Sequence, residues 1–168
     1  YDGFFRAADY IESEWKAQGL TVLRERFTAT APIVYRCEVA ALLPDGKKAS
    51  FEAYPLWPNH VNPSPYESPA EGDRLIDGGS GNLEELDGKD VEGSFVLVDF
   101  NSRWYWKNAL VFKAKGVIFT EPEDTTAVEA VQKVLNIPLS FPRLYVKGEV
   151  ASKLRELAGQ AAGATIWV

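Results

Sequence analysis

Three features of the sequence predict a mixed α/β fold. The second half alternates apolar runs of strand length with stretches of helical periodicity, as βαβ units and parallel sheets do. The first half carries branched and aromatic residues around a hairpin signal, which is typical of antiparallel strands. The chain has 168 residues, of which 46% are hydrophobic. That length suits one domain, or one domain with an attached arm.

The composition excludes several classes of function. Eighteen basic against twenty-four acidic residues leave a net charge of -6, which argues against a nucleic-acid interface. No apolar run approaches the length of a membrane span. The single Cys37 rules out an intrachain disulfide, and with the single His60 it leaves too few ligands for a catalytic zinc site in this chain alone. The sequence begins at Tyr1 and contains no methionine, so we expect a fragment or a mature segment.

The first 54 residues predict a helix followed by strands. Asp2 can cap the helix and Gly19 can end it. Its apolar residues recur at helical spacing and form one face that must be covered: Phe4, Ala8, Ile11 and Trp15. Residues 20–28 and 33–43 alternate loosely as strands do, and Asp45-Gly46 predicts a hairpin turn with residues 48–54 as the returning strand.

A proline-rich stretch marks the internal boundary. Five of the ten prolines fall within residues 55–69. Proline fixes φ and lacks a backbone donor, so we predict an extended connector over residues 55–71. This divides the chain into an N-terminal segment, 1–54, and a second domain, 72–168.

The second domain has a regular rhythm of strands and helices. Ser94 to Phe100 is an almost continuous apolar run, which is typical of a strand buried on both faces. The helix at 125–135 is expected to bury Val128, Val131 and Leu135. Strands joined through helices should pair in parallel. The predicted elements are a strand at 74–77, a glycine-rich turn at 77–82, strands at 94–100, 116–120, 143–146 and 164–168, and helices at 104–114, 125–135 and 150–158.

The best candidate site follows the longest buried strand. Loops at the carboxyl ends of strands are the usual ligand positions in α/β sheets. Three aromatic residues and an arginine in six positions match the composition of binding hot spots. One of the two tryptophans can equally pack into the core at the start of a helix. The candidate residues are Asn101, Ser102, Arg103, Trp104, Tyr105 and Trp106.

Four other features are weaker candidates. The Asp77–Asn82 turn lacks the spacing of a phosphate loop and matches one copy of a calcium-binding repeat, so we favour a tight turn. His60 has no evident partner for base catalysis, and Cys37 lies in an ordinary strand position. Asp99 and Glu121, at neighbouring strand ends, form a possible acid pair.

Several spaced motifs of residues 72–168 resemble the protease-associated (PA) domain family. They are DGGSG at 77–81, LDGKDVEGSFVLVD at 86–99, KAKGVIF at 113–119, IPLSFP at 137–142 and GEVASKL at 148–154. The resemblance implies a swivelling β/β/α fold with a β-sandwich-like sheet and βαβ units. It also implies a role in docking, in selecting substrate or in covering an active site.

The N-terminal segment adds a second resemblance. YDGFFRAADYI at 1–11 and GLTV at 19–22 are similar to the first helix and strand of M28-type zinc aminopeptidases, in which a PA domain is often inserted. The zinc-binding motifs of that family are missing here. The resemblance therefore implies a non-catalytic part of a secreted or periplasmic metallopeptidase. Zinc is expected only in the missing catalytic domain, and that domain and a peptide or protein substrate are the expected partners.

Two other functions remain open at this stage. The chain could be an autonomous small-ligand or carbohydrate-binding module that uses the same six-residue loop. It could also be an enzyme that uses the Asp99–Glu121 pair, although acids at strand ends are common. Peptide and glycoside panels separate these classes.

Overall fold

The computed structural model describes residues 2–28, 33–56, 64–134, 139–160 and 164–168. The chain forms two compact units, Tyr1–Thr30 and Ala31–Val168. The predicted mixed α/β class is confirmed, with helices and an eight-stranded sheet. Within the described ranges no helix has the length and apolar character needed to cross a membrane.

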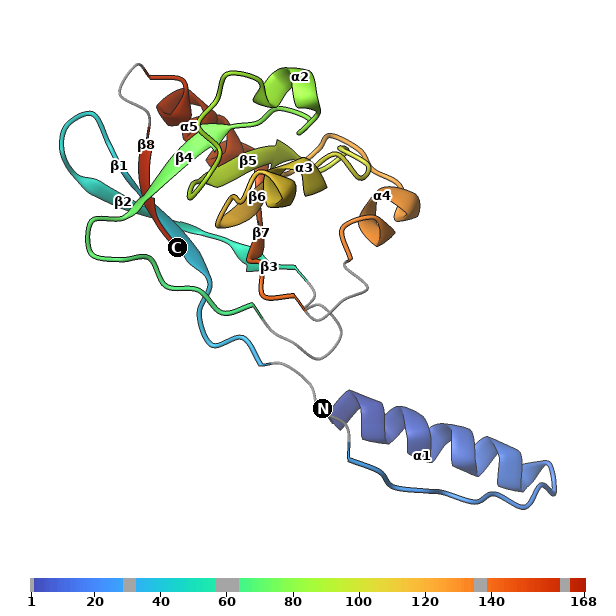
Figure 1. Cartoon of the computed structure of the whole chain (residues 1–168). Coiled ribbons are helices and arrows are strands. Elements are labelled where there is room, and N and C mark those ends of the chain that lie inside the picture. Colours follow the sequence, from blue (N-terminus) through green and yellow to red (C-terminus); the bar gives the residue numbers. More distant parts are fainter. Residues whose placement is uncertain (1, 29–32, 57–63, 135–138, 161–163) are drawn as a thin grey trace. The chain divides into compact units, whose positions relative to one another are not determined.

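The smaller unit is a helix followed by an extended segment. Helix α1, Asp2–Ala17, confirms the predicted helix. Residues 20–28 run back along it without forming a strand, so the β structure expected there is wrong (Figure 1). A strand needs a partner to receive its backbone hydrogen bonds, and this segment has only a helix beside it. Side chains hold the two together instead, because Arg24 pairs with Asp9 at 2.7 Å and with Glu12 at 3.4 Å.

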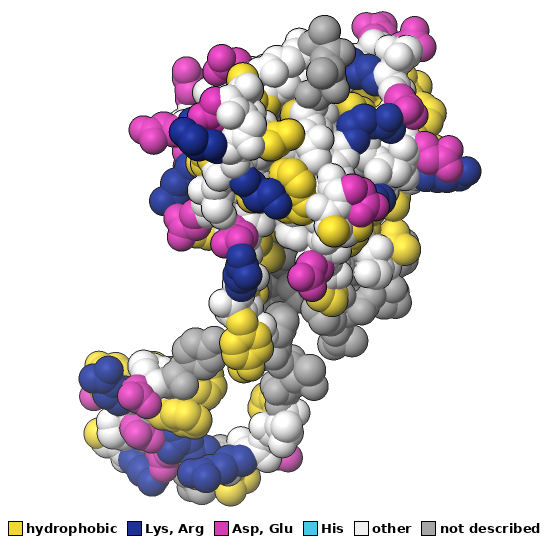
Figure 2. All heavy atoms as spheres, turned by 90° about the vertical axis from the view of Figure 1, so that its left-hand side faces the viewer, with side chains coloured by type: hydrophobic (Ala, Val, Ile, Leu, Met, Phe, Trp, Pro, Cys, Tyr) yellow, Lys and Arg dark blue, Asp and Glu magenta, His cyan; other side chains and the backbone are white. Residues whose placement is uncertain are grey.

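This unit exposes much of its apolar surface. None of the residues of α1 is buried, and Phe4, Ile11 and Trp15 of the predicted apolar face all remain exposed. Figure 2 shows hydrophobic side chains at the surface of this unit. Within this unit, residues 20–28 therefore leave exposed the face that the sequence requires to be covered.

The larger unit is built on one mixed sheet in the order β2-β1-β8-β4-β5-β6-β7-β3. Strands β4 to β7 are parallel, as expected for βαβ units. Strand β8 is antiparallel to both β1 and β4, so the expected parallel pairing fails for this last strand. The strands are β1 Glu38–Leu42, β2 Lys48–Glu52, β3 Tyr54–Pro55, β4 Asp73–Asp77, β5 Phe95–Asp99, β6 Gly116–Thr120, β7 Arg143–Val146 and β8 Ala164–Trp167.

One stretch of chain supplies both outer strands of the sheet. The predicted hairpin is present, with Leu43 and Lys47 bonded across the Asp45-Gly46 turn at 2.8 Å. Its returning strand β2 is separated from β3 by Ala53 alone, yet β3 pairs with β7 at the opposite edge. The sheet therefore curls until its two edges are joined through this residue (Figure 1). The hairpin belongs to the same compact unit as the βαβ half, and the predicted boundaries at 54 and 72 stay a prediction.

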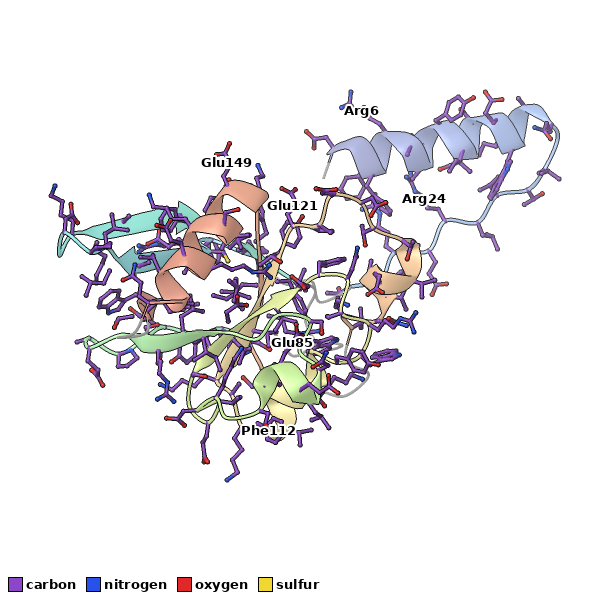
Figure 3. The ribbon with its side chains drawn as sticks, turned by 90° about the horizontal axis from the view of Figure 1, so that it is seen from above. Arg6, Arg24, Glu85, Phe112, Glu121 and Glu149 are labelled. Carbon is purple, nitrogen blue, oxygen red and sulfur yellow. The ribbon has the colours of Figure 1, made fainter. Side chains whose placement is uncertain are left out.

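Two apolar clusters lie on opposite faces of the sheet. Side chains alternate along a strand, so Phe95 and Leu97 of β5 join one cluster while Val96 and Val98 join the other. Helix α5, Gly148–Ala158, covers the first cluster with Ala151, Leu154 and Leu157. Helices α2, Leu83–Leu86, and α3, Lys107–Val111, lie on the second face (Figure 3). Burial on both faces confirms the interpretation of the Ser94–Phe100 run.

Two helices are shorter than the sequence predicts. Helix α3 covers only part of 104–114, and α4 is Ala127–Val131 within the predicted 125–135. The expected burial of Val128 and Val131 is wrong, because both are exposed. The side of α4 that faces the protein carries Glu129 instead, which bonds the backbone of Arg103. Leu135 lies outside the described residues.

Candidate functional site

The predicted 101–106 loop follows β5 at the carboxyl edge of the parallel strands. Arg103 in this loop has a left-handed backbone, with φ of +48°. This conformation costs an L-residue about 1–2 kcal/mol, so the surrounding structure must hold it in place. The turn is closed by Tyr105, whose N–H donates to the Ser102 carbonyl at 2.9 Å.

A buried ion pair holds Arg103 from both sides. The Arg103 N–H donates to Glu129 Oε2 at 2.9 Å, and Lys133 Nζ donates to the Arg103 carbonyl at 3.0 Å. Lys133 also donates to Glu129 Oε2 at 3.1 Å, and it is only 3% exposed. Glu129 and Lys133 therefore form a clamp on one peptide segment.

Burial and pairing shift the pKa values of both clamp residues. Burial lowers the pKa of Lys133, and the bond to Glu129 opposes this shift. Burial alone would raise the pKa of Glu129, but the bonds from Lys133 and the Arg103 N–H hold it below its usual value. A lowered carboxyl pKa means that the clamp is tightest when Glu129 is ionised.

The first and last residues of the loop anchor it to neighbouring segments. Asn101 Nδ2 donates to the Asp124 carbonyl at 2.8 Å, and Asn101 Oδ1 accepts from Thr125 Oγ1 at 2.7 Å. Trp106 is fully buried, and its indole N–H donates to the Gln132 carbonyl at 2.9 Å. Its ring packs between aromatic and cationic side chains of the second apolar cluster: Phe119 at 5.8 Å, Phe141 at 6.4 Å and the Arg143 guanidinium at 5.9 Å.

The middle of the loop is open to solvent. Trp104 is 45% exposed and Tyr105 is 51% exposed, and Asn101 and Arg103 are exposed as well. Lys107 Nζ lies 3.9 Å from the centre of the Trp104 ring, where it covers one face. The sequence left open which of the two tryptophans packs into the core. The structure places Trp106 in the core and leaves Trp104 exposed to solvent. Ser102 is also buried, so four of the six candidate residues form the surface.

The possible acid pair is not a free pair of carboxylates. Arg155 Nη2 donates to Asp99, and Thr120 Oγ1 lies 3.4 Å from the same carboxylate. Glu121 instead accepts from the Gly148 N–H at 2.9 Å. Burial, followed by the Glu121 carboxylate, raises the pKa of Tyr145 to about 12. Each acid therefore has its own partner, which does not favour shared acid–base chemistry.

The glycine-rich turn encloses a carboxylate of its own chain. The Ser80 N–H donates to Glu85 Oε2 at 2.7 Å. Gly79 has φ of +54°, which favours glycine, and a Cβ there would lie 2.5 Å from Glu85 Oε1, so this carboxylate would have to move. The described residues contain no group of three or more His, Cys, Asp or Glu side chains placed to hold a metal ion. The bond from Ser80 joins the turn to Glu85 in α2.

The two remaining candidates are Cys37 and His60. Cys37 is partly buried, and burial raises the pKa of its thiol, which disfavours the nucleophilic thiolate. His60 lies outside the described residues. The clamp was missed at the sequence level, although Glu129 and Lys133 stand at the i,i+4 spacing of a helical ion pair.

Comparisons with known proteins give structural matches alone. No family model matches the chain, and no curated protein matches it. An aminopeptidase from Aneurinibacillus sp. strain AM-1 is 22% identical with a TM-score of 0.57, and the match covers 98% of this chain and 37% of that one. A peptidase M28 precursor from Shewanella amazonensis SB2B is 11% identical with a TM-score of 0.47, over 77% of this chain and 33% of that one.

The first of these matches shows a shared fold. This chain spans about a third of the length of the two solved structures that it resembles. Its fold is therefore that of part of the Aneurinibacillus aminopeptidase chain, a mixed sheet with helices on both faces.

Proposed function

We propose that this chain is a non-catalytic accessory segment of an M28-type zinc aminopeptidase, with a PA-like domain that binds peptide or protein. The observation that carries the proposal is the match to the Aneurinibacillus aminopeptidase, which includes nearly all of this chain and about a third of the other. The sequence motifs that resemble the PA and M28 families point the same way. The proposal places the protein outside the cell or in the periplasm.

The proposed lack of zinc catalysis in this chain rests on its small number of zinc ligands. Catalytic zinc is bound mainly by His, with Asp, Glu or Cys completing the set. The chain has one histidine and one cysteine, and the His-x-Asp motif of the resembled family is missing. Zinc would belong to a catalytic domain beyond this chain, and that domain is a proposed partner.

The 101–106 loop is the proposed binding surface. Trp104, Tyr105 and Arg103 are exposed, and these residue types dominate binding hot spots. The clamp and the buried Trp106 fix the loop before a partner arrives, so little conformational entropy is lost on binding.

The exposed aromatic rings also favour one alternative, a carbohydrate-binding module. Sugar rings and peptide side chains can both pack on Trp104 and Tyr105, so the loop alone does not choose between them. Probing the 168-residue chain against a peptide array and a glycan array separates the two. Binding to peptides that is lost in Trp104→Ala supports the proposal, and glycan binding lost in the same variant refutes it.

The control for this experiment is Tyr35→Ala. Tyr35 is an exposed aromatic residue outside the loop, so its removal should leave array binding unchanged. The claim of no catalysis is tested on the same sample with an aminopeptidase substrate and by mass spectrometry for zinc. Stoichiometric zinc together with turnover would overturn it.

A further inference from the structure

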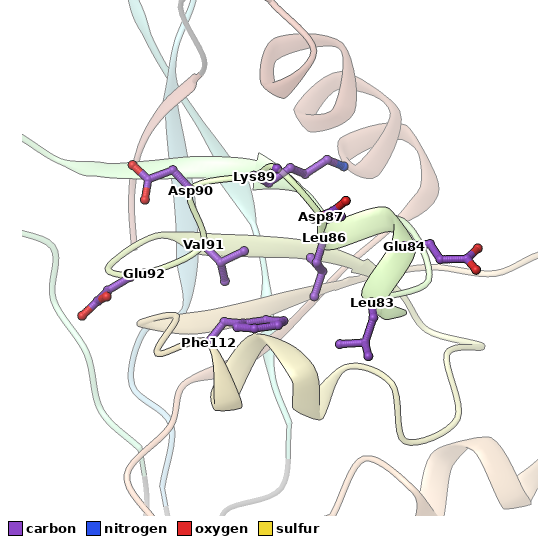
Figure 4. Close-up of a pocket in the computed structure, with 10 residues that line it drawn as sticks. Leu83, Glu84, Leu86, Asp87, Lys89, Asp90, Val91, Glu92 and Phe112 are labelled. Atoms are coloured by element: carbon purple, nitrogen blue, oxygen red, sulfur yellow. The ribbon is translucent and has the colours of Figure 1, made fainter.

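A groove lies on the second face of the sheet, away from the 101–106 loop residues. It has a volume of about 660 Å³ and runs between α2, the following segment and the end of α3 (Figure 4). Its lining combines an apolar floor with a rim of carboxylates. The floor contains Leu83, Leu86, Val91 and Phe112, and the rim contains Glu84 and Asp87.

The floor is apolar and accessible at its edges. Leu86 and Val91 are buried in the second cluster, whereas Phe112 is 43% exposed and Leu83 is 61% exposed. Figure 4 shows the Phe112 ring beside Val91, Leu86 and Leu83. Two large apolar side chains therefore face solvent around a buried base, which is the arrangement of a docking pocket for an apolar side chain.

The walls of the groove are fixed by hydrogen bonds. Arg74 Nη2 donates to the carbonyls of Asp90 and Glu92, at 2.8 Å and 3.2 Å. The Gly93 N–H donates to the Lys113 carbonyl at 3.0 Å, which joins the segment after α2 to the segment after α3. The groove is therefore formed without a partner, and ordering it costs little on binding.

The local cations are already engaged, and two carboxylates are not. Arg74 pairs with Asp90 at 2.5 Å, and Lys113 pairs with Glu92 at 3.3 Å. Lys89, the cation in the lining, donates to the Asp77 carbonyl at 2.6 Å. Within the described part of the chain, the side chains of Glu84 and Asp87 have no hydrogen bond or ion pair.

The two free carboxylates both lie at the rim of the groove. Glu84 lies in α2, and Asp87 caps its end three residues later. Figure 4 shows the two side chains pointing in different directions, so an arginine guanidinium or a lysine ammonium could pair with either carboxylate. The apolar floor beside them favours a bulky apolar residue next to that cation.

We propose that this groove binds a segment of a partner protein in which an arginine or lysine stands next to a bulky apolar residue. The apolar side chain enters between Phe112 and Leu83, and the cation pairs with Glu84 or Asp87. This site goes beyond the proposed function, because it shares no residue with the 101–106 loop. It would give the chain a second docking site, which prefers a partner segment with a positive charge.

The test uses the whole 168-residue chain and three labelled peptides in a fluorescence anisotropy titration. One peptide has arginine beside leucine and phenylalanine, the second has glutamine in place of arginine, and the third has glutamate. The first should bind roughly tenfold or more tightly than the second, and the third should bind most weakly. Raising the ionic strength to about 0.15 M should weaken the first and leave the second nearly unchanged. Equal binding of all three peptides would overturn the proposal.

Paired variants separate the site from general surface charge. Glu84→Gln with Asp87→Asn should reduce affinity for the arginine peptide roughly tenfold and remove its salt dependence. The control, Glu149→Gln with Glu156→Gln on α5, makes the same change in net charge on the other face of the sheet. An equal loss in both double variants would show a nonspecific charge effect and refute the proposal.

The apolar floor is tested in the same way. Phe112→Ala should lower the affinity for the arginine peptide roughly tenfold. Val111 is an exposed neighbour outside the lining, so Val111→Ala should leave this affinity unchanged. Thermal melts confirm that both variants are folded. Sedimentation that shows a dimer of the free chain, abolished by Phe112→Ala, would mean that a second copy occupies the groove, and would refute the proposal.

Discussion

Trp104 and Trp106 are two residues apart and should respond to truncation in opposite ways. Trp104 is 45% exposed at the loop surface, while Trp106 is fully buried. Replacing each by alanine removes the same indole ring from two different environments. The pair therefore separates binding from folding within a single loop.

The expected magnitudes follow from the area that each ring buries. A fully buried aromatic side chain removes roughly 150–250 Å² from water. Trp106→Ala should therefore lower the free energy of unfolding by about 3–5 kcal/mol, with the lost hydrogen bond to Gln132 included in that range. The half-exposed Trp104 buries on the order of 100 Å², which at about 25 cal/mol per Å² gives about 2.5 kcal/mol at most for Trp104→Ala.

Two measurements on the two variants check this reasoning. Urea unfolding gives the stabilities, and titration with the peptide selected on the array gives the affinities. Trp104→Ala should weaken peptide binding by roughly 1–3 kcal/mol with a small change in stability. If Trp104→Ala destabilises as much as Trp106→Ala, the ring is part of the core and the assignment of the surface is wrong. Unchanged stability together with unchanged binding would remove the loop from the proposed site.

Three further predictions concern stability. Lys133→Met should cost about 3 kcal/mol in urea unfolding, because it leaves the Glu129 carboxylate unpaired in a mostly buried position, and unchanged stability would contradict the clamp. Burial raises the pKa of Asp73, but bonds from Lys115, Ser68 and Tyr66 hold it below the usual value. The resulting stability should be present above the unfolded-state pKa of about 3.9 and should be lost as the pH falls toward the folded-state value; Asp73→Asn should flatten this acid limb of the stability curve. Gly78→Ala should destabilise by about 1–3 kcal/mol in thermal melts, because its Cβ would lie 2.4 Å from Val96 Cγ1, whereas Gly3→Ala in α1 meets no atom within 4 Å and should not.

The strands could be predicted where burial alone decides them. Strands β5 and β6 are apolar on both faces, so their apolar runs identify them as strands whichever strands lie beside them. Strand β6 lies at the predicted residues 116–120. Residues 20–28 alternate only loosely and have no strand beside them, so the strand prediction fails there. A strand's neighbours come from distant parts of the chain and cannot be read from local pattern.

The candidate site was only partly predictable for the same reason. The position of the loop followed from the strand before it, and the aromatic composition followed from the residues themselves. The clamp depends on contacts between Arg103 and residues 26 and 30 positions later, which no local pattern encodes. Helix α2 was also missed, because its four residues are stabilised by the Asn82 cap and by the Glu85 carboxylate held in the glycine turn.

The position of β8 has a consequence for the order in which this fold can assemble. This strand is made after the other seven strands of the sheet, yet it lies between β1 and β4 in the interior of the sheet. During synthesis, β1 and β4 each keep one unpaired edge until residues 164–167 leave the ribosome and β8 can pair with both. Open strand edges are sites of intermolecular pairing, and contacts between distant residues slow folding. The nascent sheet is therefore most prone to aggregate just before β8 is made, when chaperone binding would matter most.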